Sequence, residues 1–330
     1  MKSRIFSGIQ PSGDLHIGNY LGALAQWSKL QESGDYEILF CVVDLHAITV
    51  PQDPVILKKK IREVAALYIA CGIDPSKSKI FIQSENPDHA YLTWIFDCIT
   101  PMGWMERMTQ YKDKSKKNGE RTSVGLFNYP LLMASDILLY DPDLVPVGDD
   151  QKQHLELAAD VAEKFNKTFG EAFKIPKIFN QKETARIMSL SNPTSKMSKS
   201  DEDPSGSILL LDDAETIEKK VKRAVTDSGN EIQYHSDKPA ISNLLAIYSG
   251  FSGTSIENAE RKNKNSSYGE FKADLASVLV EKLGEIQRRF NELIKDEAHL
   301  NTVLDEGRDF AHSISSKKIE LVKDLVGLRR

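Results

Sequence analysis

The sequence has few cysteines and no excess of positive charge. Its three cysteines, Cys41, Cys71 and Cys98, lack the C-x-x-C spacing of a zinc or redox site, and an odd number cannot form a complete disulfide set. We therefore expect three buried thiols and a cytoplasmic location. The 43 Lys and Arg against 48 Asp and Glu give a formal charge of −5. This balance excludes a generally basic nucleic-acid coat protein, but it leaves room for local basic patches.

Long apolar runs are also missing. The N-terminus, MKSRIFSGIQ, lacks the apolar core of a signal peptide. The longest uninterrupted apolar stretch, near Ile38–Val43, is far too short to cross a bilayer, so we expect no membrane association. What remains is an ordinary globular composition of 40% hydrophobic and 28% charged residues over 330 positions. This length exceeds what one hydrophobic core usually serves and predicts two domains.

Strand-like and helix-like segments alternate through the first half of the chain. Strands are predicted where short apolar or β-rich runs occur, at Arg4–Ile9, Glu37–Val43, Lys79–Gln83 and Leu144–Val147. Helices are predicted where apolar residues recur at helical spacing, at Asn19–Leu30, Val55–Ala70, Ala90–Cys98, Met105–Lys117, Leu131–Tyr140 and Gln151–Phe169. Such alternation predicts an α/β fold, an open parallel sheet of Rossmann-like type with helices on both faces.

The second half of the chain is mostly helical. Its predicted helices are Ala214–Ala224, Ile241–Ser249, Ile256–Lys262, Phe271–Lys295 and Arg308–Val326. The change of pattern falls in Ser191–Ser207, which is rich in Ser, Pro, Lys and Asp. We therefore expect an α/β domain over residues 1–192 and a smaller, all-helical domain over residues 193–330.

Three segments lie where an open parallel sheet would bind a ligand, at junctions between strands and helices. The first, Ser7–Leu24 (SGIQPSGDLHIGNYLGAL), contains glycines that let a ligand approach the backbone and side chains that can donate to phosphate. The second, Lys196–Ser200 (KMSKS), places two lysines and two hydroxyls on a loop. The third, Gly148–Gln151 (GDDQ), follows a strand. Taken singly, each also fits a simpler interpretation: a turn into a helix, a solvated linker and a helix cap.

Taken together, these segments resemble the motifs of a known enzyme class. HIGN near residue 16 and KMSKS near residue 196, separated by an α/β pattern, resemble the two signatures of class I aminoacyl-tRNA synthetases. Within that class, the chain resembles the bacterial tryptophanyl-tRNA synthetase family over essentially its whole length. The matching segments, in order, are SGIQPSG, VDLHAIT, ERMTQYKDK, YPLLMASDILLYD, VPVGDDQKQH and RIMSL before KMSKS. Asn19 replaces the last His of the HIGH form, and as a neutral side chain it can only donate hydrogen bonds to phosphate.

The resemblance implies activation of tryptophan by ATP, followed by transfer to tRNA(Trp). In-line attack on the α-phosphate needs positioning and positive charge rather than a protein nucleophile. The implied catalytic residues are Gln10, His16, Asn19, Lys196 and Lys199. The implied ATP-binding residues are Gln10, Pro11, Ser12, Gly18, Asn19, Gly148, Asp149, Asp150, Ile187, Lys196, Met197, Ser198, Lys199 and Ser200. Mg²⁺ is expected to accompany ATP and to be held mainly by its phosphates, without a dedicated protein metal site.

The resemblance also implies a pocket for the amino acid. Its implied residues are Phe6, Gly8, His46, Tyr129, Met133, Asp136, Val145, Val147 and Gln151. Met133 and Asp136 lie about one helical turn apart and therefore share a face. Burial of the indole would attract phenylalanine and tyrosine nearly as well, so discrimination is expected from Asp136, which can accept the indole N–H. His46 is equally consistent with a packed core histidine. Lys114 is equally consistent with a surface lysine.

Partners and alternatives complete the expectations. The family resemblance implies a homodimer, for which Trp94, Trp104 and the region around Ile95–Met108 offer apolar residues. It also implies that the helical half binds the tRNA anticodon. The alternatives are a tyrosyl-tRNA synthetase, a small-molecule nucleotidylyltransferase and a synthetase-like paralogue with altered catalysis. GDDQKQH, GIQPSG and HIGN favour tryptophan, the helical half argues against a nucleotidylyltransferase, and the retained lysines and Asp136 argue against lost catalysis.

Overall fold

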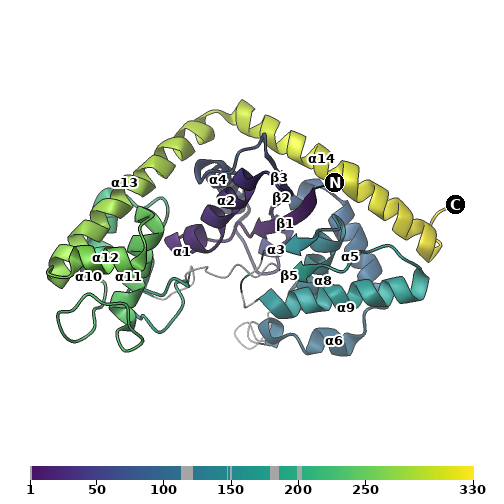
Figure 1. Cartoon of the computed structure of the whole chain (residues 1–330). Coiled ribbons are helices and arrows are strands. Elements are labelled where there is room, and N and C mark those ends of the chain that lie inside the picture. The colour runs from purple at the N-terminus through teal and green to yellow at the C-terminus, as the bar shows by residue number, and fades with distance from the viewer. Residues whose placement is uncertain (1, 113–121, 147, 149–150, 179–185, 199–202) are drawn as a thin grey trace.

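The core of the molecule is a five-stranded parallel sheet with strand order β3-β2-β1-β4-β5 (Figure 1). The computed structural model describes residues 2–112, 122–146, 148, 151–178, 186–198 and 203–330. The strands are β1 (Ser3–Ile9), β2 (Tyr36–Val42), β3 (Ser78–Ile82), β4 (Leu144–Val145) and β5 (Lys177–Ile178). The predicted open parallel α/β sheet is confirmed. Because β1 lies at its centre, the loop that follows β1 emerges in the middle of the sheet edge.

Apolar residues of the strands alternate between two hydrophobic layers. In β2, Ile38, Phe40 and Val42 join the layer that contains α4, whereas Leu39 and Cys41 join the layer that contains α5, α8 and α9. Both faces of the strand are therefore buried, which explains its nearly continuous apolar sequence.

Helices surround the sheet and make up most of the second half. In the first half they are α1 (Ile17–Asn19), the π-helical turn η1 (Tyr20–Leu24), α2 (Ala25–Ser33), α3 (Asp44–Ala47), α4 (Pro54–Ala70), η2 (Gln83–Glu85), α5 (Asp88–Ile99), α6 (Met102–Glu106), α8 (Val124–Leu138) and α9 (Lys152–Phe169). In the second half they are η5 (Pro204–Gly206), α10 (Ala214–Arg223), α11 (Pro239–Ser252), α12 (Ile256–Asn263), α13 (Tyr268–Lys295) and α14 (Glu297–Val326).

Several boundaries differ from the predictions, mostly because of helix caps. α8 begins at Val124 rather than Leu131, since the Ser123 hydroxyl accepts the Leu126 N–H at 3.1 Å and Pro130 is accommodated inside the helix. α14 begins at Glu297 rather than Arg308, because Asp296 caps it. The π-helical turn interrupts the single helix predicted for Asn19–Leu30. α6 ends at Glu106, within the predicted Met105–Lys117 helix. β5 was not predicted, because a strand of two residues is too short to show a periodic pattern.

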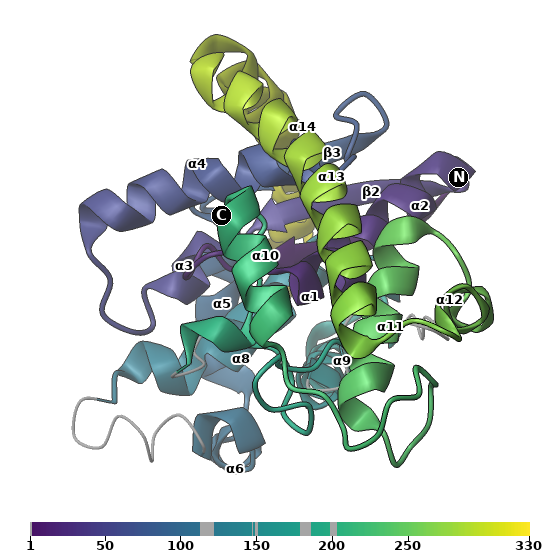
Figure 2. The ribbon, with the colours of Figure 1, turned by 90° about the vertical axis from the view of Figure 1, so that its left-hand side faces the viewer.

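The two C-terminal helices form an arch over the molecule (Figure 1). α13 contacts α10, α11 and α4, and Figure 2 shows it running between α10 and α11. α14 then returns across the sheet and contacts β3 and α5. Its Gly307 lies so close to β3 that an added Cβ would collide with the Ile80 carbonyl. The end of the chain therefore packs directly on the α/β half.

The cysteines and the helix lengths bear on two further expectations. All three cysteines are free; Cys41 and Cys71 are buried as predicted. Cys98 is exposed, contrary to the prediction, because α5 turns Leu92, Ile95 and Phe96 toward the core instead.

None of the helices in the described part of the chain is long and apolar enough to span a membrane.

Candidate active site

The HIGN segment is held against the chain that follows the KMSKS segment. The Ile17 N–H donates to the Ile208 carbonyl at 2.9 Å, and the Leu210 N–H donates to the Leu15 carbonyl at 2.8 Å. Between these bonds, His16 and Leu209 form an antiparallel bridge. The loop after β1 is therefore fixed by residues about 190 positions away in the sequence, a contact that only the fold creates.

The two motif segments meet through Ile187. The Met197 N–H donates to the Ile187 carbonyl at 3.0 Å, and a Cβ added to Gly18 would lie 3.6 Å from the Ile187 Cβ. Met197 is buried and anchors its segment, whereas Lys196 is exposed beside it. This arrangement places HIGN and the first residues of KMSKS at one edge of the sheet, at the seam with the helical half.

His16 and Asn19 form a reciprocal cap on the short helix α1. The Gly18 N–H donates to Nδ1 of His16 at 3.1 Å, and the His16 N–H donates to Oδ1 of Asn19 at 3.0 Å. A Cβ on Gly18 would lie 2.9 Å from the His16 ring, so the cap requires glycine at this position. The motif thus has a structural task in addition to the catalytic one expected of it.

The end of β1 is shaped by close backbone contacts. A Cβ on Gly8 would lie 2.7 Å from the Cys41 carbonyl of the neighbouring strand, so a side chain is not tolerated there. The following Gln10 donates from Nε2 to the His46 carbonyl at 3.0 Å. Pro11 is buried and Ser12 is half-buried. Gln10 therefore connects the HIGN loop to the segment that carries His46.

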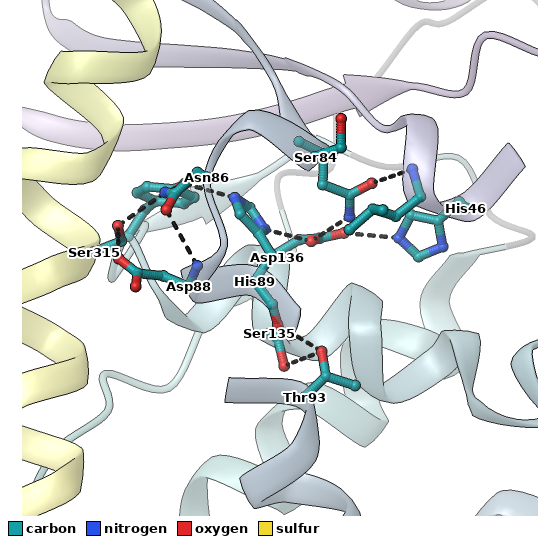
Figure 3. Close-up of polar contacts among 12 residues, drawn as sticks. His46, Ser84, Asn86, Asp88, His89, Thr93, Ser135, Asp136 and Ser315 are labelled. Atoms are coloured by element: carbon teal, nitrogen blue, oxygen red, sulfur yellow. Dashed lines mark hydrogen bonds and ion pairs between the residues drawn. The ribbon is translucent and has the colours of Figure 1, made fainter. Parts of the chain in front are cut away.

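Asp136 is the most strongly engaged side chain of the predicted amino-acid pocket. It is 2% exposed; its Oδ2 lies 2.8 Å from Nε2 of His46, while its Oδ1 accepts Nε2 of Gln83 at 2.6 Å and contacts Nδ1 of His89 at 2.7 Å (Figure 3). Burial alone would raise the pKa of Asp136, but the hydrogen bonds from His46 and His89 lower it from 3.8 to about 2. The carboxylate is therefore ionised at neutral pH and acts only as an acceptor.

Aromatic and apolar side chains surround this carboxylate. Phe6 stacks on Tyr140 with ring centroids 5.3 Å apart, and Val145 is buried in the same layer. Tyr129 lies edge-on to His46 at 6.2 Å, and burial raises the pKa of its phenol to about 12. Met133, one turn before Asp136, is half-buried. The structure thus brings the predicted pocket residues Phe6, His46, Tyr129, Met133, Asp136 and Val145 to one region, next to Gly8 at the end of β1.

Comparison with known proteins agrees with this geometry. Residues 1–284 match the family of class I tRNA synthetases for tryptophan and tyrosine (W and Y). The chain is 53% identical to the tryptophan–tRNA ligase of Bacillus anthracis over 99% of each chain, and 52% identical to that of Bacillus subtilis over 100% of this chain and 99% of the relative.

Solved structures lead to the same family. The tryptophanyl-tRNA synthetase of Mycoplasma pneumoniae superposes with a TM-score of 0.90 at 35% identity, covering 100% of this chain and 99% of the other. That of Campylobacter jejuni, complexed with ADP and tryptophan, superposes with a TM-score of 0.85 at 36% identity, covering 98% and 99%. The chain belongs to the class I tRNA synthetases for tryptophan and tyrosine. Its closely similar bacterial relatives are tryptophan–tRNA ligases.

Some predicted site residues of this synthetase lie outside the described residues. These are Lys114, Val147, Asp149, Asp150, Lys199 and Ser200. Two neighbouring site residues are described. Gly148 is exposed, and its carbonyl accepts the Gln151 N–H at 2.9 Å just before α9 begins. Ser198 is half-buried. In the described part of the chain, no group of three or more His, Cys, Asp or Glu side chains is arranged to hold a metal ion.

Three buried polar residues that lie around the predicted site were not predicted. Gln83 ends the predicted strand Lys79–Gln83 and His89 opens α5, where polar side chains are common and carry no motif. Asn243 of α11 is buried and brackets Met188, accepting its N–H at 2.8 Å and donating to its carbonyl at 2.9 Å. A polar residue inside an apolar helical stretch was the only signal available for Asn243.

Proposed function

We propose that this synthetase activates L-tryptophan with ATP and then transfers the amino acid to tRNA(Trp). A carboxylate oxygen of tryptophan attacks the α-phosphorus, the bond from that phosphorus to the bridging oxygen breaks, and diphosphate leaves. A hydroxyl of the terminal tRNA ribose then attacks the carbonyl carbon of tryptophanyl-adenylate, and AMP leaves. The observation that carries the proposal is the buried, ionised Asp136, which lies among apolar side chains near the junction of the two motif segments.

ATP is proposed to lie along the seam between HIGN and KMSKS. The Oδ1 atom of Asn19 serves the helix cap, so its Nδ2 group would meet a phosphate oxygen. The exposed Lys196, with Lys199, would supply positive charge to the phosphates, and Ser198 and Ser200 would supply hydroxyls. Residues Gln10, Pro11, Ser12, Gly18 and Ile187 would border the nucleotide. Mg²⁺ would enter as a complex with ATP, since phosphate oxygens and waters are its preferred ligands.

Tryptophan is proposed to lie with its indole N–H toward Asp136. Oδ1 of Asp136 accepts from Gln83 and His89, whereas Oδ2 meets His46 and has a second lone pair that can accept a further donor. Met133, Phe6 and Val145 would pack on the ring, and Tyr129 and Gln151 would hold the ammonium group. Phenylalanine would pack on the same apolar side chains but would leave the Asp136 acceptor without a donor.

The larger assembly is proposed from the exposed surface and the family. Exposed apolar side chains gather on α5, α6 and the start of α8, namely Tyr91, Trp94, Met102 and Val124. They support a homodimer whose interface includes these helices. We further propose residues 1–192 as the catalytic domain and residues 193–330 as the KMSKS loop and the tRNA-binding part, working in the cytoplasm, where ATP and tRNA are available.

ATP–diphosphate exchange tests this function directly. Purified protein is assayed with tryptophan, tyrosine and phenylalanine separately, and tRNA(Trp) charging is measured next. Exchange that depends on tryptophan, followed by charging of tRNA(Trp), is the expected result. Preferential exchange with tyrosine would favour a tyrosyl-tRNA synthetase, and the absence of exchange with all three would favour a paralogue with altered catalysis.

A further inference from the structure

A buried chain of hydrogen bonds connects Asp136 to the C-terminal helix. His89 contacts Asp136 through Nδ1 at 2.7 Å and the Tyr140 hydroxyl through Nε2 at 2.7 Å. Asn86 donates from Nδ2 to the Tyr140 hydroxyl at 3.1 Å and to the Ser315 hydroxyl of α14 at 2.9 Å. Figure 3 shows Asp136, His89, Asn86 and Ser315 following one another toward α14. All five residues of this chain, including Tyr140, are at most 2% exposed.

Between Asn86 and Asp136 the hydrogen bonds run in one direction, toward the carboxylate, while the Asn86 amide also donates to Ser315 on the other side. Ionised Asp136 can only accept, so Nδ1 of His89 donates to it, and in the tautomer that carries its proton on Nδ1 the Nε2 atom accepts from the Tyr140 hydroxyl. The Tyr140 oxygen in turn accepts from the Asn86 amide. From Asn86 to Asp136, each partner therefore favours one tautomer or rotor of the next.

The far end of the chain is fixed by α14 itself. The Ser315 hydroxyl donates to Oδ2 of Asp88 at 2.6 Å, and Oδ1 of Asn86 accepts the Asp88 N–H at 3.3 Å. Three residues further along α14, Lys318 forms an ion pair at 2.6 Å with Asp141, the residue next to Tyr140. Together with the close approach of Gly307 to β3, these contacts hold α14 in its position against the α/β half.

We propose that the chain His89–Tyr140–Asn86–Ser315 is a positioning device through which α14 orients Asp136 toward the indole N–H of the substrate. This inference rests on the proposed function, because it assumes that tryptophan is the ligand of Asp136. None of the four residues is placed against the substrate; they act through His89, which holds Oδ1 and leaves Oδ2 to accept the indole N–H. The last long helix of the chain thereby contributes to amino-acid selection in the α/β half.

Calorimetric binding of two ligands tests the proposal. L-Tryptophan is compared with 3-benzothienyl-L-alanine, in which sulfur replaces the indole N–H and cannot donate to Asp136. Tyr140→Phe removes the hydroxyl that donates a hydrogen bond to His89, so the dissociation constant for tryptophan should rise about tenfold. The constant for the analogue should change by less than about twofold, because it does not use the oriented carboxylate. Ser315→Ala, at the far end, should act in the same direction by about threefold.

Matched variants separate positioning from general packing. Ser316→Ala removes a hydroxyl next to Ser315 that donates only within α14, to the His312 carbonyl at 2.6 Å. Tyr248→Phe removes a hydroxyl that meets Lys262 at 2.7 Å in the helical half. Neither should change the binding of either ligand.

Two results would overturn the proposal. One is equal weakening of tryptophan and the analogue by Tyr140→Phe, which would mean a purely structural role. The other is unchanged tryptophan binding in both Tyr140→Phe and Ser315→Ala, with thermal unfolding showing that they are folded. Failure of the proposed function is recognised separately, because the unaltered protein would then not support tryptophan-dependent diphosphate exchange.

Discussion

The two ends of the active site are built from different material. At the proposed ATP end, the described residues form backbone pairs and include glycines and an exposed lysine, as in the Ile17–Ile208 hydrogen bond and the exposure of Lys196. At the proposed tryptophan end, buried side chains form a network around Asp136. A highly charged nucleotide that must enter and leave suits adaptable loops, whereas selection of one aromatic amino acid requires an acceptor held rigidly in an apolar wall.

Removal of a KMSKS lysine should have the largest effect. Lys199→Ala should lower kcat for diphosphate exchange by about 100- to 1,000-fold, because its charge is used most as negative charge develops in the transition state. Tryptophan affinity should stay within about twofold. Lys58→Ala, which removes an exposed lysine of α4, is the matched control. An unchanged kcat with a raised KM for ATP would instead assign Lys199 to ground-state binding.

Asp136→Asn should have the next largest effect on activity, and the effect should be confined to the proposed tryptophan end of the site. Loss of the charged acceptor should lower kcat/KM for tryptophan by about 10- to 100-fold and narrow the preference over phenylalanine and tyrosine. The KM for ATP should remain within about twofold. Diphosphate exchange with the three amino acids measures the preference, and a collapse of ATP affinity with preserved selectivity would make Asp136 a structural residue.

The low pKa of Asp136 has a consequence for stability. Since the folded pKa of about 2 lies below the ordinary value of 3.8, ionised Asp136 stabilises the folded state above about pH 4. That contribution, about 2 kcal/mol, should be lost as the pH falls from 4 toward 2. The difference in unfolding free energy between the unaltered protein and Asp136→Asn, measured from pH 6 to pH 2, should shrink accordingly. A difference that is constant over this range would contradict the ionised, hydrogen-bonded carboxylate.

Substitutions of the glycines in and after the HIGN segment should have the smallest effect on activity. Gly18→Ala should raise the KM for ATP by about tenfold, because its Cβ would lie 2.9 Å from the His16 ring and displace the cap. Gly22→Ala, only one turn later, meets nothing within 4 Å and should leave KM nearly unchanged. Equal effects of the two substitutions would show that helix propensity rather than the cap explains them.

The motifs of the proposed ATP end can be recognised along the sequence, whereas the network around Asp136 cannot, and the reason is physical. Phosphate binding uses contiguous motifs such as HIGN and KMSKS, so their residue types can be recognised along the chain. Alternating strands and helices likewise predicted the parallel sheet. The partners of Asp136 come from separate elements: Gln83 follows β3, His89 opens α5, and Ser315 completes the network from α14. Only tertiary packing brings them together, and no local pattern distinguishes them from ordinary polar residues.

The division of labour between the two ends is tested most directly by titrating tryptophan into the ATP-free protein, Asp136→Asn and Lys199→Ala. Our account predicts that Asp136→Asn weakens tryptophan binding by at least about tenfold, whereas Lys199→Ala leaves it within about twofold of the unaltered protein. Equal weakening by both variants, or undiminished binding by Asp136→Asn, would contradict it.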